Sequence, residues 1–205
     1  MEVIVDGAPG FTTDAAPTDV MGMVAAVSVS LQGKGRSLLS LTVDGKELQP
    51  AEMVGALSGK PLEAVGKLEV TSELTSKLVS DSLAELETVI PDLAKVCHEL
   101  AAVFQGADPK SGYEPFHQLA DIWAHVKSRQ EMIAHSLGFA LDSLTIDRKS
   151  VGDLHTELNG FLSEAVGALE SGDLILLGDL LQYELAPRAE KEVRITALLR
   201  ERSGG

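Results

Sequence analysis

Glu114 and His117 have the residue types and the spacing that hold iron in some helix bundles. A di-iron centre needs a second Glu-x-x-His and two further glutamates, all directed into the bundle, and the sequence holds no second copy. The apolar pattern through Phe116 and Leu119 also turns His117 outward. We therefore expect no di-iron site.

His117, Asp121 and His125 lie four residues apart, so they share one helical face, and imidazole and carboxylate groups are common metal ligands. The same helical phase puts them opposite Trp123, on a face that we expect to be solvated. The sequence leaves open whether these three residues bind a metal, and we predict no metal site from them.

Cys97 is the single cysteine, and it lies within an apolar repeat, so we expect a small buried hydrophobe and not a nucleophile. His98 and His155 have no serine or cysteine partner that the sequence suggests, and acidic pairs such as Glu85 and Glu87 are common on helix exteriors. No Ser-His-Asp arrangement or nucleophile elbow is present. The sequence predicts no catalytic residue, no cofactor and no enzymatic activity.

The glycine-rich stretch from Gly33 to Ser37 invites comparison with phosphate-binding loops. It follows a predicted helix instead of preceding one, so no helix N-terminus points at an anion there. We expect a helix C-terminus and a loop.

The helical elements are dominated by a heptad pattern between residues 79 and 104. Apolar residues recur at alternating spacings of four and three, which predicts a helix packed nearly parallel to other helices. Pro91 interrupts this helix without shifting its phase, which favours a kink over a break. The seam consists of Val79, Leu83, Leu86, Ile90, Leu93, Cys97, Leu100 and Phe104.

A second helix is predicted from about Glu114 to Asp142. Gln130 is its one polar seam residue; such a residue can fix the register of a bundle or reach a wet edge, and we favour the wet edge. The expected seam is Phe116, Leu119, Trp123, Val126, Gln130, Ile133, Leu137, Ala140 and Leu144.

Two further helices are predicted after residue 147. The third runs over residues 149–170 with Asp147 as its cap, and the fourth begins near Asp173 and is apolar through Leu185. Pro187 kinks or divides the fourth helix. Because the sequence beyond Pro187 is highly charged, we expect a solvated extension that leaves the bundle.

The first seventy residues predict a small β-rich unit. The expected order is a hairpin with strands at Glu2–Val5 and Phe11–Thr13, a helix after Asp19, a strand over 38–43, a short helix at 50–54 and a closing strand over 67–71. This order, with the segment Leu41-Thr42-Val43-Asp44-Gly45-Lys46-Glu47-Leu48 as third strand and turn, resembles the ubiquitin-like β-grasp fold. Here the closing strand runs into a helix instead of a free tail.

The chain ends in Gly204-Gly205, the terminus that ubiquitin-like modifiers activate. A modifier function is therefore one alternative, although the glycines are separated from the β-rich unit by the whole helical region. Flexible ends are also commonly rich in glycine and serine.

The net charge of −14 limits the partners. Affinity for nucleic acid comes mostly from Lys and Arg releasing counterions from phosphates, so nucleic acid is an unsuitable partner, and anionic membranes are disfavoured likewise. The segment Met1–Asp6 lacks the basic residues of a secretion signal, and no uncharged apolar run reaches membrane-spanning length. We expect a cytoplasmic protein.

The expected architecture is α+β: a ubiquitin-like β-grasp domain over residues 1–71, then an antiparallel four-helix bundle with a charged C-terminal extension over 72–205. The expected function is non-enzymatic protein binding, as an adaptor, assembly factor or chaperone, with self-association or another protein as partner. A metal-binding or enzymatic bundle is the other alternative. The apolar face through Leu174, Leu177, Leu181 and Leu185 either completes the bundle or accepts a partner helix, and sheet edges at Val3–Val5 or Leu68–Thr71 could add a partner strand.

Overall fold

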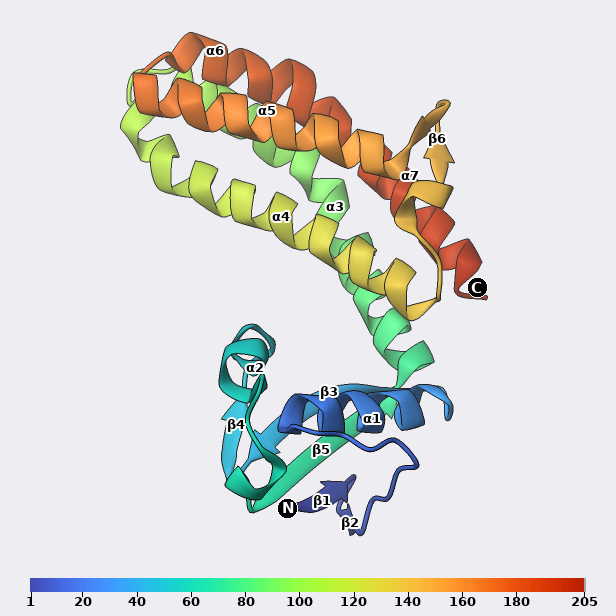
Figure 1. Ribbon diagram of the computed structural model, residues 1–205. Coiled ribbons are helices and arrows are strands. Elements are labelled where there is room, and N and C mark those ends of the chain that lie inside the picture. Colours follow the sequence, from blue (N-terminus) through green and yellow to red (C-terminus); the bar gives the residue numbers. More distant parts are fainter. Residues whose placement is uncertain (205) are drawn as a thin grey trace. The chain divides into compact units, whose positions relative to one another are not determined.

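The computed structural model describes residues 1–204, without the side chains of residues 50 and 51, and its fold is α+β (Figure 1). The chain divides into two compact units, Met1–Leu78 and Val79–Gly205. A five-stranded mixed sheet dominates the first unit, and helices dominate the second.

The sheet of the first unit has the strand order β2-β1-β5-β3-β4, in which β1 and β5 are parallel and the other neighbours are antiparallel. Helix α1 lies across one face of the sheet (Figure 1). This arrangement is consistent with the expected β-grasp-like unit. The elements are β1 (Glu2–Val5), β2 (Ala8–Pro9), α1 (Val20–Gln32), β3 (Arg36–Val43), β4 (Lys46–Leu48), α2 (Pro50–Leu57), the 3-10 turn η1 (Leu62–Ala64) and β5 (Lys67–Leu74).

Helix α1 begins and ends as its sequence predicts. The Asp19 carboxylate accepts a hydrogen bond from the Gly22 amide at 2.7 Å, which satisfies one of the free N–H groups of the first turn, and Gly33 follows the last residue. Four apolar residues spaced three or four apart then face the sheet, so the core of this unit lies between one helix and one sheet face. The helix contributes Val20, Val24, Val27 and Leu31, and the sheet contributes Val3, Leu41, Val43, Leu48, Leu68 and Val70.

Two tight turns set the strand register of this unit. Asp6-Gly7 joins β1 to β2 and Asp44-Gly45 joins β3 to β4, and all four residues have positive φ angles, between 49° and 84°. Two-residue turns of this kind reverse the chain at once. The return strand therefore lies at Ala8–Pro9, and the predicted position at Phe11–Thr13 is wrong.

The predicted sheet edges are also wrong. Strand β5, which contains Leu68–Thr71, lies in the middle of the sheet and pairs with both β1 and β3. Ile4 and Val5 of β1 pair with β2 on one side and with β5 on the other. The main chain at the start of β3 has a neighbour on one side only, because β4 pairs with Leu41–Val43 and stops there.

The second unit begins within α3, whose predicted seam is confirmed. All eight seam residues are buried, and the helix continues through Pro91 without a break. The elements are α3 (Thr75–Phe104), the 3-10 turn η2 (Pro109–Gly112), α4 (Tyr113–Ser136), the 3-10 turn η3 (Leu141–Ser143), β6 (Thr145–Ile146), β7 (Lys149–Ser150), α5 (Val151–Ser171), α6 (Leu174–Asp179), the π-helical segment η4 (Leu180–Leu185) and α7 (Ala186–Arg202).

Helix α4 ends at Ser136, six residues before its predicted end. Gly138 has a φ of 79°, and the Phe139 amide donates to the Ala134 carbonyl at 3.1 Å, which closes the helix. Between α4 and α5 the chain forms a β6–β7 hairpin that the helical pattern did not indicate. Asp147 lies in the hairpin turn with a φ of 51°, so it is not the cap of α5; Ser150 is, accepting from the Asp153 amide at 3.0 Å.

Segments α6, η4 and α7 follow one another without a loop, and α5 lies beside them (Figure 1). The π-helical turns occur directly before Pro187, which has no N–H to donate and cannot continue an ordinary helical ladder. The Ala186 amide donates to the Leu181 carbonyl, five residues back, so the wider turn passes the proline while the helix goes on. The sequence predicted a kink or a division at this residue.

The predicted solvated extension after Pro187 is wrong. Helix α7 buries Ile195 and Leu199, and two of its exposed arginines pair with carboxylates of the same unit. Arg194 binds both Asp147 oxygens at 2.7 and 2.9 Å, and Arg200 binds both Glu87 oxygens at 2.9 and 2.8 Å. The charges of this stretch therefore attach the helix instead of keeping it in solvent.

Replacing Leu199 with alanine tests whether α7 belongs to the core. Because Leu199 is fully buried, Leu199→Ala should lower the free energy of unfolding by about 2–5 kcal/mol, measured by urea titration of the full chain. Val193→Ala, at a position of the same helix that is 44% exposed, should change it by about 0.5 kcal/mol or less. Equal small effects would mean that α7 does not pack as described.

Candidate functional site

A chain of polar side chains crosses the interior of the helical unit. Gln130 of α4, His155 of α5 and Glu192 of α7 are each 5% exposed or less, as is Arg188 one turn before Glu192. Polar groups at this depth need hydrogen-bond partners, because burial without them costs free energy. These four residues supply partners for one another and are the candidate functional site.

The hydrogen bonds of this chain converge on the carboxylate of Glu192 from both ends. Neutral His155 donates from Nε2 to the Gln130 carbonyl oxygen at 2.9 Å, and the Gln130 amide nitrogen donates to Glu192 Oε2 at 2.9 Å. Arg188 Nε donates to the other Glu192 oxygen, Oε1, at 2.8 Å. Both oxygens of Glu192 accept hydrogen bonds, as the oxygens of a carboxylate do. Burial raises the pKa of Glu192, and Arg188 and Gln130 oppose this shift.

His155 is held neutral by the same surroundings. Burial lowers the pKa of His155 to about 4, and the positive charges of Arg188 and Lys127 add to the effect. The Glu131 carboxylate lies 3.8 Å from the Nδ1 atom of His155, which is too far for a hydrogen bond. At neutral pH this histidine is therefore a hydrogen-bond donor and not a charged group.

Arg188 is only partly satisfied by Glu192. Its Nη2 atom lies 2.7 Å from the Glu192 Oε1 atom as an ion pair, yet neither Nη1 nor Nη2 makes a hydrogen bond with any described residue. Arg188 is 2% exposed, so these N–H groups are buried as well. Five N–H donors in a fixed fork are more than one carboxylate oxygen can satisfy.

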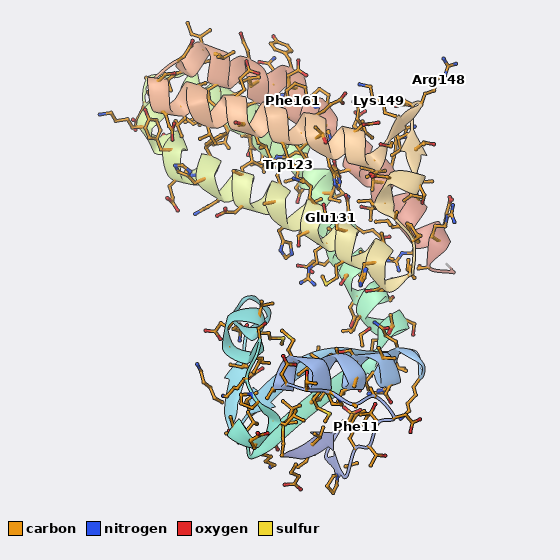
Figure 2. All side chains as sticks on the ribbon, viewed as in Figure 1. Phe11, Trp123, Glu131, Arg148, Lys149 and Phe161 are labelled. Atoms are coloured by element: carbon orange, nitrogen blue, oxygen red, sulfur yellow. The ribbon has the colours of Figure 1, made fainter. Side chains whose placement is uncertain are left out.

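Arg188 also lines a cavity of about 580 Å³ between α5 and the η4–α7 segment. Figure 2 shows two of the lining residues, Phe161 on α5 and Lys149 at the end of the hairpin. The walls combine rings with charges of both signs. The lining residues are Lys149, Glu157, Gly160, Phe161, Glu164, Tyr183, Glu184, Pro187, Arg188 and Lys191.

The predicted metal candidates lie elsewhere, on the exposed face of α4. His117, Asp121 and His125 are all exposed, as their helical phase predicts. His125 pairs with Glu85 at 3.2 Å, and Glu85 also pairs with Arg129 at 3.4 Å. Within residues 1–204 the structure brings together no group of three or more His, Cys, Asp or Glu residues that could hold a metal ion.

Cys97 is fully buried, as predicted, and burial raises the pKa of its thiol to about 12, with a smaller opposing contribution from Trp123. A thiol in this environment stays protonated at neutral pH and is a poor nucleophile. His98 lies beside it in the sequence but is exposed. Of the terminal pair, Gly205 lies outside the described residues, so the modifier alternative stays a prediction.

The four predicted partner-binding leucines face the unit's own interior. Leu177, Leu181 and Leu185 are fully buried in the helical core, and Leu174 is partly buried against it. These side chains complete the core, the first of the two alternatives that the sequence offered. The apolar side chains that the same segment exposes are Ile175, Leu176 and Tyr183.

The favoured interpretation of Gln130 is wrong, because this residue is fully buried and contacts two other helices. Arg188 and Glu192 were not predicted as site residues from the sequence. Both fall on an alternating four and three spacing that continues from Leu185 to Ile195, so they occupy seam positions. A charged pair at seam positions of two consecutive turns was the signal that could have revealed the site.

Comparison with known proteins places part of the chain in a described family. Residues 81–192 match a family model described as a domain of unknown function (DUF8042), and this range includes all four members of the polar chain. An uncharacterized protein of Treponema pallidum (strain Nichols) is 26% identical over 166 residues, which cover 80% of this chain and 80% of that protein. No solved structure matches.

The coupling between Arg188 and Glu192 can be measured by substitution. Glu192→Met leaves a buried guanidinium without its carboxylate, so the free energy of unfolding should fall by about 3–5 kcal/mol. The double variant Arg188→Met/Glu192→Met removes both charges and should lose clearly less than the sum of the two single variants. Arg194→Met breaks an exposed pair and is the control; it should change the free energy of unfolding far less than Glu192→Met does. Additive losses for Arg188 and Glu192 would show that the two charges do not compensate each other.

His155 should make stability depend on pH in a definite direction. Below about pH 6.5 a histidine in the unfolded chain is protonated while His155 in the folded protein stays neutral, so the unfolded state binds more protons. The free energy of unfolding should therefore fall between pH 6.5 and 4, by about 2–3 kcal/mol at pH 4.5 from this group alone.

The effect of His155 is obtained by comparing urea titrations of the wild type and His155→Gln at pH 7.5 and 4.5. The variant should lose about 2 kcal/mol less than the wild type over this interval. His98→Gln, at an exposed position of α3, is the matched control and should follow the wild type. An identical pH response of wild type and His155→Gln would contradict the buried neutral histidine.

Proposed function

The chain belongs to the DUF8042 family, and we propose that it is a non-enzymatic protein-binding protein that acts as an adaptor, assembly factor or chaperone. The observation that carries the proposal is an exposed apolar patch on the α6–η4 segment. The patch consists of Ile175, Leu176 and Tyr183, whose exposed fractions are 74%, 37% and 63%.

The position of the patch supports a binding role. Ile175 and Tyr183 are eight residues apart, roughly two helical turns, so they lie on the same side of the segment. The opposite side is fixed in the core through Leu177 and Leu181. Apolar and aromatic side chains on a rigid helix suit protein contacts, because a partner removes them from water at little cost in side-chain entropy.

The charge of the chain narrows the choice of partner. A net charge of −14 favours a partner with basic residues around an apolar centre and disfavours nucleic acid and anionic membrane surfaces. No helix among residues 1–204 is long and apolar enough to cross a bilayer. We propose a protein partner in the cytoplasm, or a second copy of this chain, as the occupant of the patch.

We also propose a more specific description of the two units. We take the first unit as a ubiquitin-like β-grasp domain, and the second as an antiparallel bundle of four rods, formed by α3, α4, α5 and the continuous α6–η4–α7 segment. The strand order of the sheet and the absence of loops within the last rod support this view. Such a bundle presents the patch on a rigid support.

A double substitution in the patch tests the proposal. Tagged wild-type protein and Ile175→Ser/Leu176→Ser are expressed in the native host, crosslinked and purified, and the recovered proteins are quantified by mass spectrometry. The double variant should recover its specific partner at least tenfold less, and its fold should persist because both residues are exposed.

The matched control is Ile122→Ser/Met132→Ser, which removes two exposed apolar side chains from α4 and should bind as the wild type does. Sedimentation of the three purified proteins separates self-association from binding to another protein. The proposal fails when the wild type is monomeric and recovers nothing more than the double variant does.

A further inference from the structure

We propose that the cavity between α5 and the η4–α7 segment binds a ligand through a carboxylate group, with Arg188 and Lys191 as the residues that recognise it. This inference does not rest on the protein-binding proposal. It concerns the polar floor of the cavity, whereas the protein-binding test concerns Ile175 and Leu176, which do not line it.

Arg188 supplies the recognition geometry. Its Nε and Nη2 atoms lie 2.8 and 2.7 Å from the same Glu192 oxygen, so one edge of the guanidinium faces the protein's own carboxylate. The other edge, formed by Nη1 and Nη2, has no hydrogen-bond partner among the described residues, although the side chain is only 2% exposed. Two parallel N–H groups match the two oxygens of a carboxylate, so a ligand that enters from the cavity can satisfy them.

Lys191 gives a second cationic group at the same cavity. It is half-buried, and it forms no ion pair with any residue that the structure describes. Lys149, the third cation of the lining, is already paired with Glu157. The cationic groups left for a ligand therefore lie along α7: Lys191, which has no ion pair among the described residues, and the Nη1 and Nη2 donors of Arg188.

The acidic residues of the cavity favour a carboxylate ligand over a phosphate. Glu157, Glu164 and Glu184 equal the three cationic lining residues in number, and Glu192 lies behind Arg188. A phosphate with two negative charges meets repulsion from these carboxylates in a chain that is already strongly acidic. A carboxylate carries a single negative charge and has the planar shape of the free guanidinium edge, so the site favours a carboxylate.

The walls of the cavity indicate the rest of the ligand. Phe161, Tyr183 and Pro187 provide rings and apolar surface next to the charged floor, and a volume of about 580 Å³ holds a small molecule or one side chain with its backbone. Tyr183 and Glu184 belong to the π-helical segment, and single π turns occur frequently at functional sites. We infer a ligand with an apolar or aromatic body and one carboxylate.

A titration of the full chain followed by ¹H–¹⁵N NMR tests the site. The probes are phenylacetate, its uncharged amide phenylacetamide, inorganic phosphate, and a blocked peptide Ala-Glu-Phe-Ala whose only charge is the glutamate. Phenylacetate or the peptide should shift the amide signals of Gly160, Tyr183 and Lys191 to saturation. Phenylacetamide and phosphate should bind at least tenfold more weakly.

The two carboxylate probes separate the sources of the ligand. Tighter binding of phenylacetate points to a free small molecule, and tighter binding of the peptide points to an acidic side chain of a polypeptide; either result supports the site. No saturable shift with either probe, or tighter binding of phosphate, would overturn the proposal.

Two glycines of α5 give a matched pair of variants. A Cβ at Gly160 or at Gly167 meets no atom within 4 Å, and both positions are exposed, but only Gly160 lines the cavity. Gly160→Leu should place a side chain in the cavity and abolish binding of the carboxylate probe. Gly167→Leu should bind as the wild type does, and equal binding by both variants would overturn the proposal.

Charge substitutions test the recognition groups separately. Lys191→Gln should weaken the carboxylate probe at least fivefold, whereas Lys110→Gln, which removes the same charge from an exposed position outside the cavity, should leave it unchanged. Arg188→Lys keeps a positive charge beside Glu192 but removes the free guanidinium edge, so it should weaken the probe at least tenfold. Ile175→Ser/Leu176→Ser should bind the probe normally, which makes a failure of this site distinguishable from a failure of the protein-binding proposal.

Discussion

The helical unit depends on the buried ion pair between Arg188 and Glu192. Two charges in a dry interior are tolerated only when each has a partner, and Glu192 finds its second donor on α4, at Gln130, which in turn accepts from His155 on α5. A slip of one of these helices along its axis would leave a buried polar group without a partner. The polar chain therefore restricts the register of three helices in a way that leucine contacts alone do not.

The same requirement explains why a highly charged segment forms part of the core. The charged residues of helix α7 form three kinds of contact. Arg188 and Glu192 pair with each other in the interior, Arg200 pairs with Glu87 of α3, and Arg194 pairs with Asp147 in the hairpin turn. The exposed pairs each contribute little free energy, but both are bidentate and fix the direction of the helix. Apolar side chains between them supply most of the burial.

The sequence predicted the elements whose signal is local and repeated. The seam from Val79 to Phe104 and the start of α1 at Asp19 follow from spacing and capping chemistry within one segment. The predictions that the structure contradicts have a different origin. The hairpin turn at Asp147, the early end of α4 and the central place of β5 depend on turn geometry or on pairing with distant residues, and the apolar pattern carries no information on these.

The candidate site was not predicted because its two charged residues stand in a highly charged segment, and only their helical phase distinguishes them from a solvated face. Charged residues usually indicate a solvated face. Arg188 and Glu192, however, continue the spacing of the buried leucines before them and therefore lie on the side of the helix that faces the core. The hydrogen-bond donors of Arg188 are satisfied by Glu192 only in part, because a guanidinium has more donors than one carboxylate oxygen accepts. Arg188 also lines a cavity beside the π-helical segment that precedes Pro187. A constraint of folding thus leaves a polar group available for binding, which is why the structural core and the candidate site share a residue.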